Sequence, residues 1–183
     1  MGYFGQFKSL NGDTYTVKLG NNATTEIQLA DNPFTVTYNT SATPFEPVRT
    51  STATIRIVHN NYLEDILSSQ AQGTEVILTR NDVIMWIGYL TPKIYSQDYV
   101  DEYETIELEA ADSISSLQYI DYSPVNDRGI VSFKTIIDKI CNACGNLNGY
   151  YWATSKKIDS SILTPDLLAV SEQNFFSSDT DEP

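Results

Sequence analysis

The sequence predicts a mainly β fold with α+β character, and three observations support this prediction. Short segments of alternating apolar and polar residues, separated by Gly, Asn, Asp and Pro, fill roughly the first two thirds of the chain. The apolar spacing then changes to that of a helix after Pro124. With 183 residues, 41% hydrophobic and only 19% charged, the chain can bury a core and does not resemble a disordered protein. We expect a β domain over residues 1–123 and the truncated start of a second α+β unit over 124–183.

Turn chemistry predicts two hairpins. Residues 7–10 and Thr14–Leu19 flank a turn around Gly12, where glycine supplies the positive φ that a tight loop needs. Residues 74–79 and Val83–Leu90 flank a second turn, Arg-Asn-Asp. The run of large apolar residues in Val83–Leu90 predicts burial on both faces, and we expect this hairpin at the centre of the core.

Alternation predicts further strands. Residues 24–29 are expected to pair with residues 33–38 across a turn at 30–32, and residues 53–58 form another strand. Over residues 102–110, Ile106, Leu108 and Ala110 share the inner face and the acidic residues the outer one. A final short strand is expected at residues 150–153, whereas the two prolines of residues 43–47 favour an extended loop.

Helical spacing appears in three places. Residues 60–67 predict a short helix, and Asp112 can cap a helical turn that runs through Ile114 and Leu117. The longest helix is predicted after Ser132, its N-cap, with Gly145 at its C-terminal end. Its apolar face comprises Phe133, Ile136, Ile137, Ile140, Cys141 and Cys144.

The chain is strongly acidic. Its 24 acidic and 11 basic residues leave a formal net charge of −13, with a pI near 4.2. Sequence-specific nucleic-acid binding needs a basic surface and is therefore not expected. The longest apolar run, residues 83–87, is far shorter than a membrane-spanning helix, so we expect no membrane segment. Two cysteines and an N-terminus without a secretion-like pattern favour a reducing cytoplasm as the place of synthesis.

The chemically reactive residues do not form a recognisable site. Cys141 and Cys144 lack the second ligand pair of a zinc site and fall in the last turn of the predicted helix, where buried structural thiols are expected. His59 is the only histidine, and no nucleophile motif accompanies it, so we interpret it as a surface turn residue.

The carboxylates also predict no catalytic site. Four glutamates lie close together in one segment, and a pair of such carboxylates could serve as the acid and base of a glycosidase. They alternate with apolar residues, however, which is the pattern of a solvent-exposed β surface: Glu102, Glu104, Glu107 and Glu109. The C-terminal acidic residues lack the glycine and twelfth-position glutamate of a calcium loop: Asp179, Asp181 and Glu182. Gly145 and Gly149 stand apart from any phosphate-binding motif. We predict no catalytic, cofactor-binding or metal-binding residues and no cofactor.

Four segments together carry a resemblance: residues 53–58, 73–79, 86–92 and 104–117. This succession resembles the hub proteins of bacteriophage tails, which include the baseplate hubs of contractile tails, the N-terminal part of tail-associated lysins and the related spike of type six secretion. Residues 132–145 resemble the helix that follows in that family. Residues 35–51 are similar to tail proteins of phages or prophages of gut Bacteroidales.

The resemblance implies β-barrel-like units that assemble as a homo-oligomer, with a trimer favoured and a hexamer possible. Such an assembly joins the tail tube to a spike or fibre in the virion tail and forms a channel for DNA. Its partners are other tail proteins, namely the tail tube, the distal tail protein and the spike or fibre. The resemblance implies no catalytic residues, and an acidic channel wall would repel DNA.

Three other classes stay open. A distal tail protein or other baseplate adaptor shares the architecture but closes as a hexameric ring. A carbohydrate-binding adhesive β module is favoured by the aromatic content, with Tyr95, Tyr99 and Tyr103 as its candidate residues. An enzyme is the remaining class.

Overall fold

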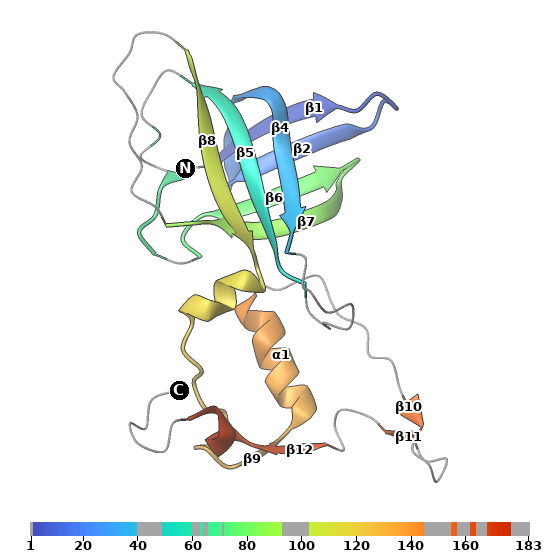
Figure 1. The fold of residues 1–183 in the computed structure, drawn as a ribbon, viewed down its shortest axis with the longest axis vertical. Coiled ribbons are helices and arrows are strands. Elements are labelled where there is room, and N and C mark those ends of the chain that lie inside the picture. The colour runs from blue at the N-terminus through green and yellow to red at the C-terminus, as the bar shows by residue number, and fades with distance from the viewer. Residues whose placement is uncertain are drawn as a thin grey trace. The chain divides into compact units, whose positions relative to one another are not determined.

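A computed structural model describes residues 2–39, 49–59, 63, 66–70, 72–92, 103–144, 155–156, 162–163 and 168–176. The chain divides into two compact units, Met1–Ser116 and Leu117–Pro183, and each is described by itself. The mainly β class predicted from the sequence is confirmed, because a single large sheet dominates the described residues (Figure 1).

The first unit is built on an eight-stranded sheet in the order β3-β1-β2-β6-β7-β8-β5-β4. The strands are β1 (Gly2–Lys8), β2 (Thr14–Leu19), β3 (Ala23–Glu26), β4 (Gln28–Tyr38), β5 (Ser51–His59), β6 (Glu75–Arg80), β7 (Val83–Leu90) and β8 (Glu104–Asp112). All pairings are antiparallel except that of β1 with β3. In Figure 1, β4, β5 and β8 cross the direction of β1, β2, β6 and β7.

The two ends of this sheet are brought together by one residue, Ile27. It separates β3, at one end of the strand order, from β4 at the other, and its N–H donates to the carbonyl of Phe4 at 2.8 Å. Gly5 on β1 leaves room for the Leu29 side chain of β4, since a Cβ there would lie 2.6 Å from it. The sheet therefore curls over its own core, but no ladder joins β3 to β4 among the described residues, so the barrel is not closed.

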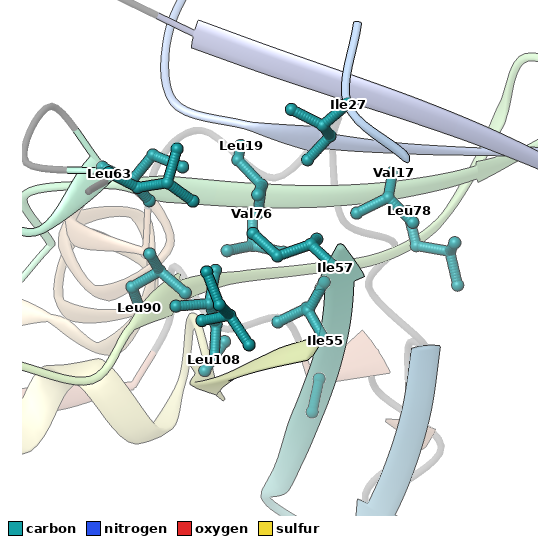
Figure 2. Close-up of a cluster of buried hydrophobic side chains, with 14 of the residues drawn as sticks. Val17, Leu19, Ile27, Ile55, Ile57, Leu63, Val76, Leu78, Leu90 and Leu108 are labelled. Atoms are coloured by element: carbon teal, nitrogen blue, oxygen red, sulfur yellow. The ribbon is translucent and has the colours of Figure 1, made fainter. Parts of the chain in front are cut away.

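The core lies on the inner face of the curled sheet (Figure 2). Its buried members come from β2, β5, β6, β7 and β8 and from the connecting segments: Val17, Leu19, Ile27, Ala53, Ile55, Ile57, Leu63, Ile66, Val76, Leu78, Trp86, Leu90, Ile106, Leu108 and Ala110. Burial of this apolar surface is the main force that holds the first unit together.

Both predicted hairpins are confirmed, but the first strand of the first hairpin is Gly2–Lys8, so the predicted bounds of 7–10 are wrong and residues 9 and 10 belong to the turn. β1 pairs with β2 around Gly12, whose φ is +86°, and β6 pairs with β7 around Asn81 and Asp82, whose φ angles are +48° and +65°. The predicted pairing of residues 24–29 with 33–38 is wrong. Residues 30–32 lie inside β4 at a shift of its register with β5, so β4 pairs with β5 instead of folding back on β3.

The prediction that β7 is buried on both faces holds for only part of the strand. Trp86, Gly88 and the two residues after it are buried, but the first three residues, Val83 to Met85, are exposed. The hydrophobic run therefore does not all belong to the core.

β8 follows the predicted alternation and leads into the predicted turn. Ile106, Leu108 and Ala110 are buried, and Glu107 and Glu109 are exposed. At the end of β8, Asp112 Oδ1 accepts the N–H of Ser115 at 2.6 Å and caps the 3-10 helix η2 (Ser115–Tyr119).

The second unit contains the predicted helix, α1 (Phe133–Ala143). Ser132 is its N-cap, as predicted, and accepts the N–H of Thr135 at 3.1 Å. The predicted apolar face is only partly covered, because Ile136 and Cys144 are buried while Phe133 and Ile140 are exposed.

Short elements complete the second unit. β9 (Ile130–Ser132) pairs with β12 (Ala169–Ser171), and the 3-10 helix η4 (Glu172–Phe175) follows β12. β10 (Ser155–Lys156) pairs with β11 (Ile162–Leu163).

Several predicted features lie outside the described residues. They are the loop at 43–47, most of the helix at 60–67, the end of the long helix at Gly145 and the strand at 150–153. In the described part of the chain, no helix is long and apolar enough to cross a membrane.

Candidate functional site

The two cysteines lie at the C-terminal end of α1. Cys141 is half-buried and Cys144 is buried as the C-cap residue. Nowhere in the described ranges do three His, Cys, Asp or Glu side chains gather in a way that could hold a metal ion. The two thiols therefore take part in the packing of side chains in the second unit.

His59 and the carboxylates of β8 share one region of the first unit. His59 is not the surface turn residue that we predicted, because it is the half-buried last residue of β5 and stands opposite Glu104 in the register with β8. On the exposed face of β8, Glu107 accepts a hydrogen bond from Arg56 at 2.6 Å, and Glu109 is also exposed. Glu102 and the residues at 179–182 lie outside the described residues. This face has the geometry of an acidic solvated sheet surface.

The first three residues of β7 form an exposed apolar segment of the first unit. Val83, Ile84 and Met85 are 63%, 39% and 48% exposed. Ile84 pairs with Thr79 and Trp86 pairs with Leu78, so Met85 is an extra residue that forms a bulge, and all three side chains of the segment are exposed to solvent. We call Val83 to Met85 the β7 arm.

The β7 arm also has an open edge. β6 pairs with one side of the strand, but β8 reaches the other side only at Gly88 to Leu90. Ser113 donates its N–H to the carbonyl of Ile87 at 3.3 Å. Within the described ranges, no strand pairs with the outer side of residues 83–86.

The turn that precedes the β7 arm is fixed to the neighbouring hairpin. The N–H of Asn81 donates to the carbonyl of Thr14 at 2.8 Å, and the Asn81 side chain accepts from the N–H of Thr14 at 3.0 Å. Its amide also donates to Asp13 at 2.7 Å. The β1–β2 and β6–β7 turns therefore end side by side (Figure 1), which holds the arm in a defined position.

A second open edge lies on β4. This strand is last in the sheet order, and β5 pairs with only one of its sides. Phe34 and Val36 pack against the core, whereas Thr35, Thr37 and Tyr38 are exposed. Over residues 34–38, no described strand pairs with the outer side. We call residues 34–38 the β4 edge.

A hollow of about 650 Å³ lies where the start of β4 passes β1. Its lining is mostly polar: Gln6, Phe7, Lys8, Glu26, Ile27, Gln28, Leu29, Ala30, Asp31, Asn32 and Pro33. The Phe7 ring stacks on Tyr15 with centroids 5.1 Å apart. The hollow thus combines amides, carboxylates and a lysine beside an aromatic pair.

Glu172 is a buried carboxylate of the second unit. Its oxygens accept hydrogen bonds from the Tyr122 hydroxyl and the N–H of Val125, both at 2.6 Å, and from the N–H of Asn126 at 2.7 Å. The Glu172 N–H donates to the carbonyl of Gly129 at 2.9 Å. These bonds fasten the segment around residue 125 to the start of η4.

Opposing effects set the ionisation of this cluster. Burial raises the pKa of Glu172, but the bonds from Tyr122, Val125 and Asn126 and the charge of Lys139 outweigh burial and lower that pKa below its ordinary value. Burial, the hydrogen bond to Glu172 and its negative charge raise the pKa of Tyr122 to about 12. Both shifts describe an ionised carboxylate that accepts from a neutral phenol.

Comparisons with protein-family models, with curated proteins and with solved structures find no match to this chain.

Sequence reasoning missed the features that the structure makes most prominent. The β7 arm carried a signal, since three large apolar residues directly follow a hairpin turn, but hydrophobicity alone was interpreted as burial. Glu172 carried only a weak signal, a single acidic residue just after a short β segment. Of the proposed sugar-binding tyrosines, Tyr103 is exposed, whereas Tyr95 and Tyr99 lie outside the described residues.

Proposed function

We propose that this chain is a structural component of a phage tail, a baseplate hub that connects the tail tube to a spike or fibre as a homo-oligomer. The exposed β7 arm is the observation that carries the proposal. Val83, Ile84 and Met85 are large apolar residues that stay exposed on a part of β7 that β8 does not reach, and an exposed group of apolar side chains marks a site of association.

The acidic character of the chain fits a channel for DNA. Glu107 and Glu109 alternate with buried residues along β8, so their carboxylates share the outer face of the sheet, where Arg56 offsets the charge of Glu107. A wall of such carboxylates in a chain of net charge −13 repels phosphate and lets DNA pass without being held. The barrel-like character of the proposed unit is supported by the way the sheet ends meet at Ile27.

The alternative within the same class is a distal tail protein or another baseplate adaptor ring, which would assemble through the same edges. The two differ in copy number, because a hub closes with three chains and the adaptor with six.

Electron microscopy of the purified full chain tests this proposal. We expect particles with threefold or sixfold symmetry and a central channel whose wall carries Glu107 and Glu109. Particles that expose this face on the outside, around a neutral or basic channel, contradict the proposed function.

A carbohydrate-binding module is a second candidate, favoured by the polar hollow between β1 and β4. Amide and carboxylate groups next to an aromatic pair are the groups that hold sugars. A glycan array with the wild-type chain tests it, with Asp31→Ala as the variant and Tyr38→Ala, an exposed tyrosine that does not line the hollow, as the control. Binding that Asp31→Ala abolishes and Tyr38→Ala spares supports this candidate, and the absence of any bound glycan contradicts it.

A further inference from the structure

The turn between β1 and β2 carries an exposed Asn-Gly pair, Asn11 and Gly12. The Gly12 N–H donates to the carbonyl of Ser9 at 3.0 Å, and the Asp13 N–H donates to the Ser9 hydroxyl at 3.2 Å. In the part of the chain that the structure describes, the Asn11 side chain makes no hydrogen bond. Its amide can therefore rotate toward the backbone of the turn.

An unrestrained asparagine can react with the backbone nitrogen of the next residue. That nitrogen attacks the asparagine Cγ and closes a five-membered ring, and a Cβ on the next residue hinders the approach. Gly12 has no side chain, and a Cβ built on it would meet nothing within 4 Å, so the space around the ring is open. The bond from Gly12 to Ser9 has to open first, and exposed turns open locally at a small cost in free energy.

The residue after each of the other described asparagines is less favourable. Within the described ranges, only Asn11 is followed by glycine. Asn32 precedes Pro33, whose nitrogen has no proton to lose. Asn148 also precedes a glycine but lies outside the described residues, so an experiment has to distinguish it from Asn11.

Asn81, in the neighbouring turn between β6 and β7, is held in place. Its side chain accepts from the N–H of Thr14 at 3.0 Å and donates to Asp13 at 2.7 Å. The residue that follows it is Asp82, which carries a Cβ. Asn81 therefore lacks both features that make Asn11 reactive, although its turn is also exposed.

We infer that Asn11 is a site of spontaneous deamidation. The Gly12 nitrogen forms a bond to Asn11 Cγ, the Cγ–Nδ2 bond breaks, and the amide leaves as ammonia with the proton that the Gly12 nitrogen loses. Water then opens the succinimide at either of its carbonyls and gives aspartate or isoaspartate at position 11. Nothing is oxidised or reduced, and water is the only co-reactant. This inference does not depend on the proposed function.

The reaction changes the turn. A succinimide nitrogen carries no hydrogen, so the bond from Gly12 to the Ser9 carbonyl is lost when the ring forms. Either product places a new negative charge in the turn that already holds Asp13. Isoaspartate also adds a methylene group to the backbone of the turn.

Incubation of the purified full chain at neutral and mildly alkaline pH tests the inference. Peptide mapping by mass spectrometry reports aspartate and isoaspartate at each asparagine separately. Asn11→Gln is one control, because its longer side chain would have to close a six-membered ring.

Asp82→Gly is the matched control for the structural argument. It gives Asn81 a following glycine but leaves the bonds of Asn81 to Thr14 and Asp13 in place. Glycine readily adopts the φ of +65° found at position 82. Circular dichroism checks that this variant is folded, and the same variant in urea supplies the unfolded reference.

We expect both aspartate and isoaspartate at position 11 of the folded wild-type chain, at a rate that rises with pH, and no such product in Asn11→Gln. In folded Asp82→Gly, Asn11 should react while Asn81 stays intact. In urea, both should react, because the hydrogen bonds that hold Asn81 are gone.

Three results would overturn the inference. Asn11 could stay intact in the folded wild-type chain while it reacts in urea. The product could be aspartate without isoaspartate, which indicates direct hydrolysis without the ring. Asn81 could react as fast as Asn11 in folded Asp82→Gly, which would mean that the Asn-Gly sequence alone decides and the contacts of the turn do not.

Discussion

Asp112 shows how one side chain fixes a corner of the first unit. Its carboxylate accepts from the backbone N–H and the hydroxyl of Ser51 at the start of β5, and from the N–H of Ser115 at the start of η2. The Ser51 hydroxyl in turn accepts from the Trp86 indole at 3.0 Å. One residue thus links β5, β7, β8 and the turn that follows.

Replacing Asp112 by alanine should destabilise the first unit by roughly 2–4 kcal/mol, because it removes a helix cap and leaves the N–H groups of Ser51 and Ser115 without their acceptor. Asp112→Asn retains one acceptor oxygen and should lose less. Urea unfolding followed by circular dichroism measures both variants. A loss below about 0.5 kcal/mol for Asp112→Ala, the range of an ordinary surface substitution, would contradict this role.

Glu172 fixes the second unit through an ionised carboxylate. Because the pKa of Glu172 is lower in the folded chain, the stability that it contributes is present above its unfolded pKa, near 4.5, and is lost as the pH falls through the folded value. The pKa of Tyr122 is raised from 10.0 to about 12, so its contribution is present below pH 10 and is lost as the pH rises toward 12.

Hydrogen exchange of the Val125 and Asn126 amides measures this dependence locally. We expect protection at neutral pH, a loss of protection below about pH 4.5, and no such acid step in Glu172→Gln. Tyr122→Phe should weaken protection while the acid step persists. An acid step of unchanged size in Glu172→Gln would show that other groups cause it.

At the scale of elements, the sequence predicts a feature correctly where that feature depends on residues close together in the chain. Gly12 predicted a turn, Ser132 predicted the start of α1, and the spacing of Ile106, Leu108 and Ala110 predicted which face of β8 is buried. Each of these signals acts within a few residues of the chain. The structure at those positions depends on backbone conformation and on one buried face.

The failures at this scale involve contacts far apart in sequence. Residues 24–29 and 33–38 were predicted to pair because both alternate, but alternation does not identify a partner, and β4 pairs with β5. Ile27 alone connects β3 at one end of the sheet to β4 at the other, and no short sequence pattern predicts such a connection. The β7 arm was missed for a related reason, since a hydrophobic residue in a core and one on an interface have the same pattern.

Loss of the Ser132 cap should weaken the first turn of α1. Ser132→Ala removes the acceptor of the Thr135 N–H and should cost about 1 kcal/mol, which corresponds to roughly fivefold less protection of that amide from exchange. Ser132→Asp, which keeps an acceptor oxygen, should restore protection. Equal protection in wild type and Ser132→Ala would mean that packing alone holds this end of the helix.

At the scale of the whole molecule, the charge and the exposed edges have to be explained together. A net charge of −13 favours a soluble, separate chain, whereas the uncharged β7 arm and β4 edge favour association. A homo-oligomer reconciles them, because it buries the neutral edges and leaves the carboxylates exposed to water. The net charge is read directly from the sequence, but the two edges could not be predicted, because they become visible only when the strand order is known.

The native mass of the full wild-type chain, measured by light scattering over a wide concentration range, tests the central claim most directly. Three copies of the 20.5 kDa chain are expected for a hub, and six for an adaptor ring. A chain that remains a monomer at every concentration would contradict assembly through these edges and the tail function built on it.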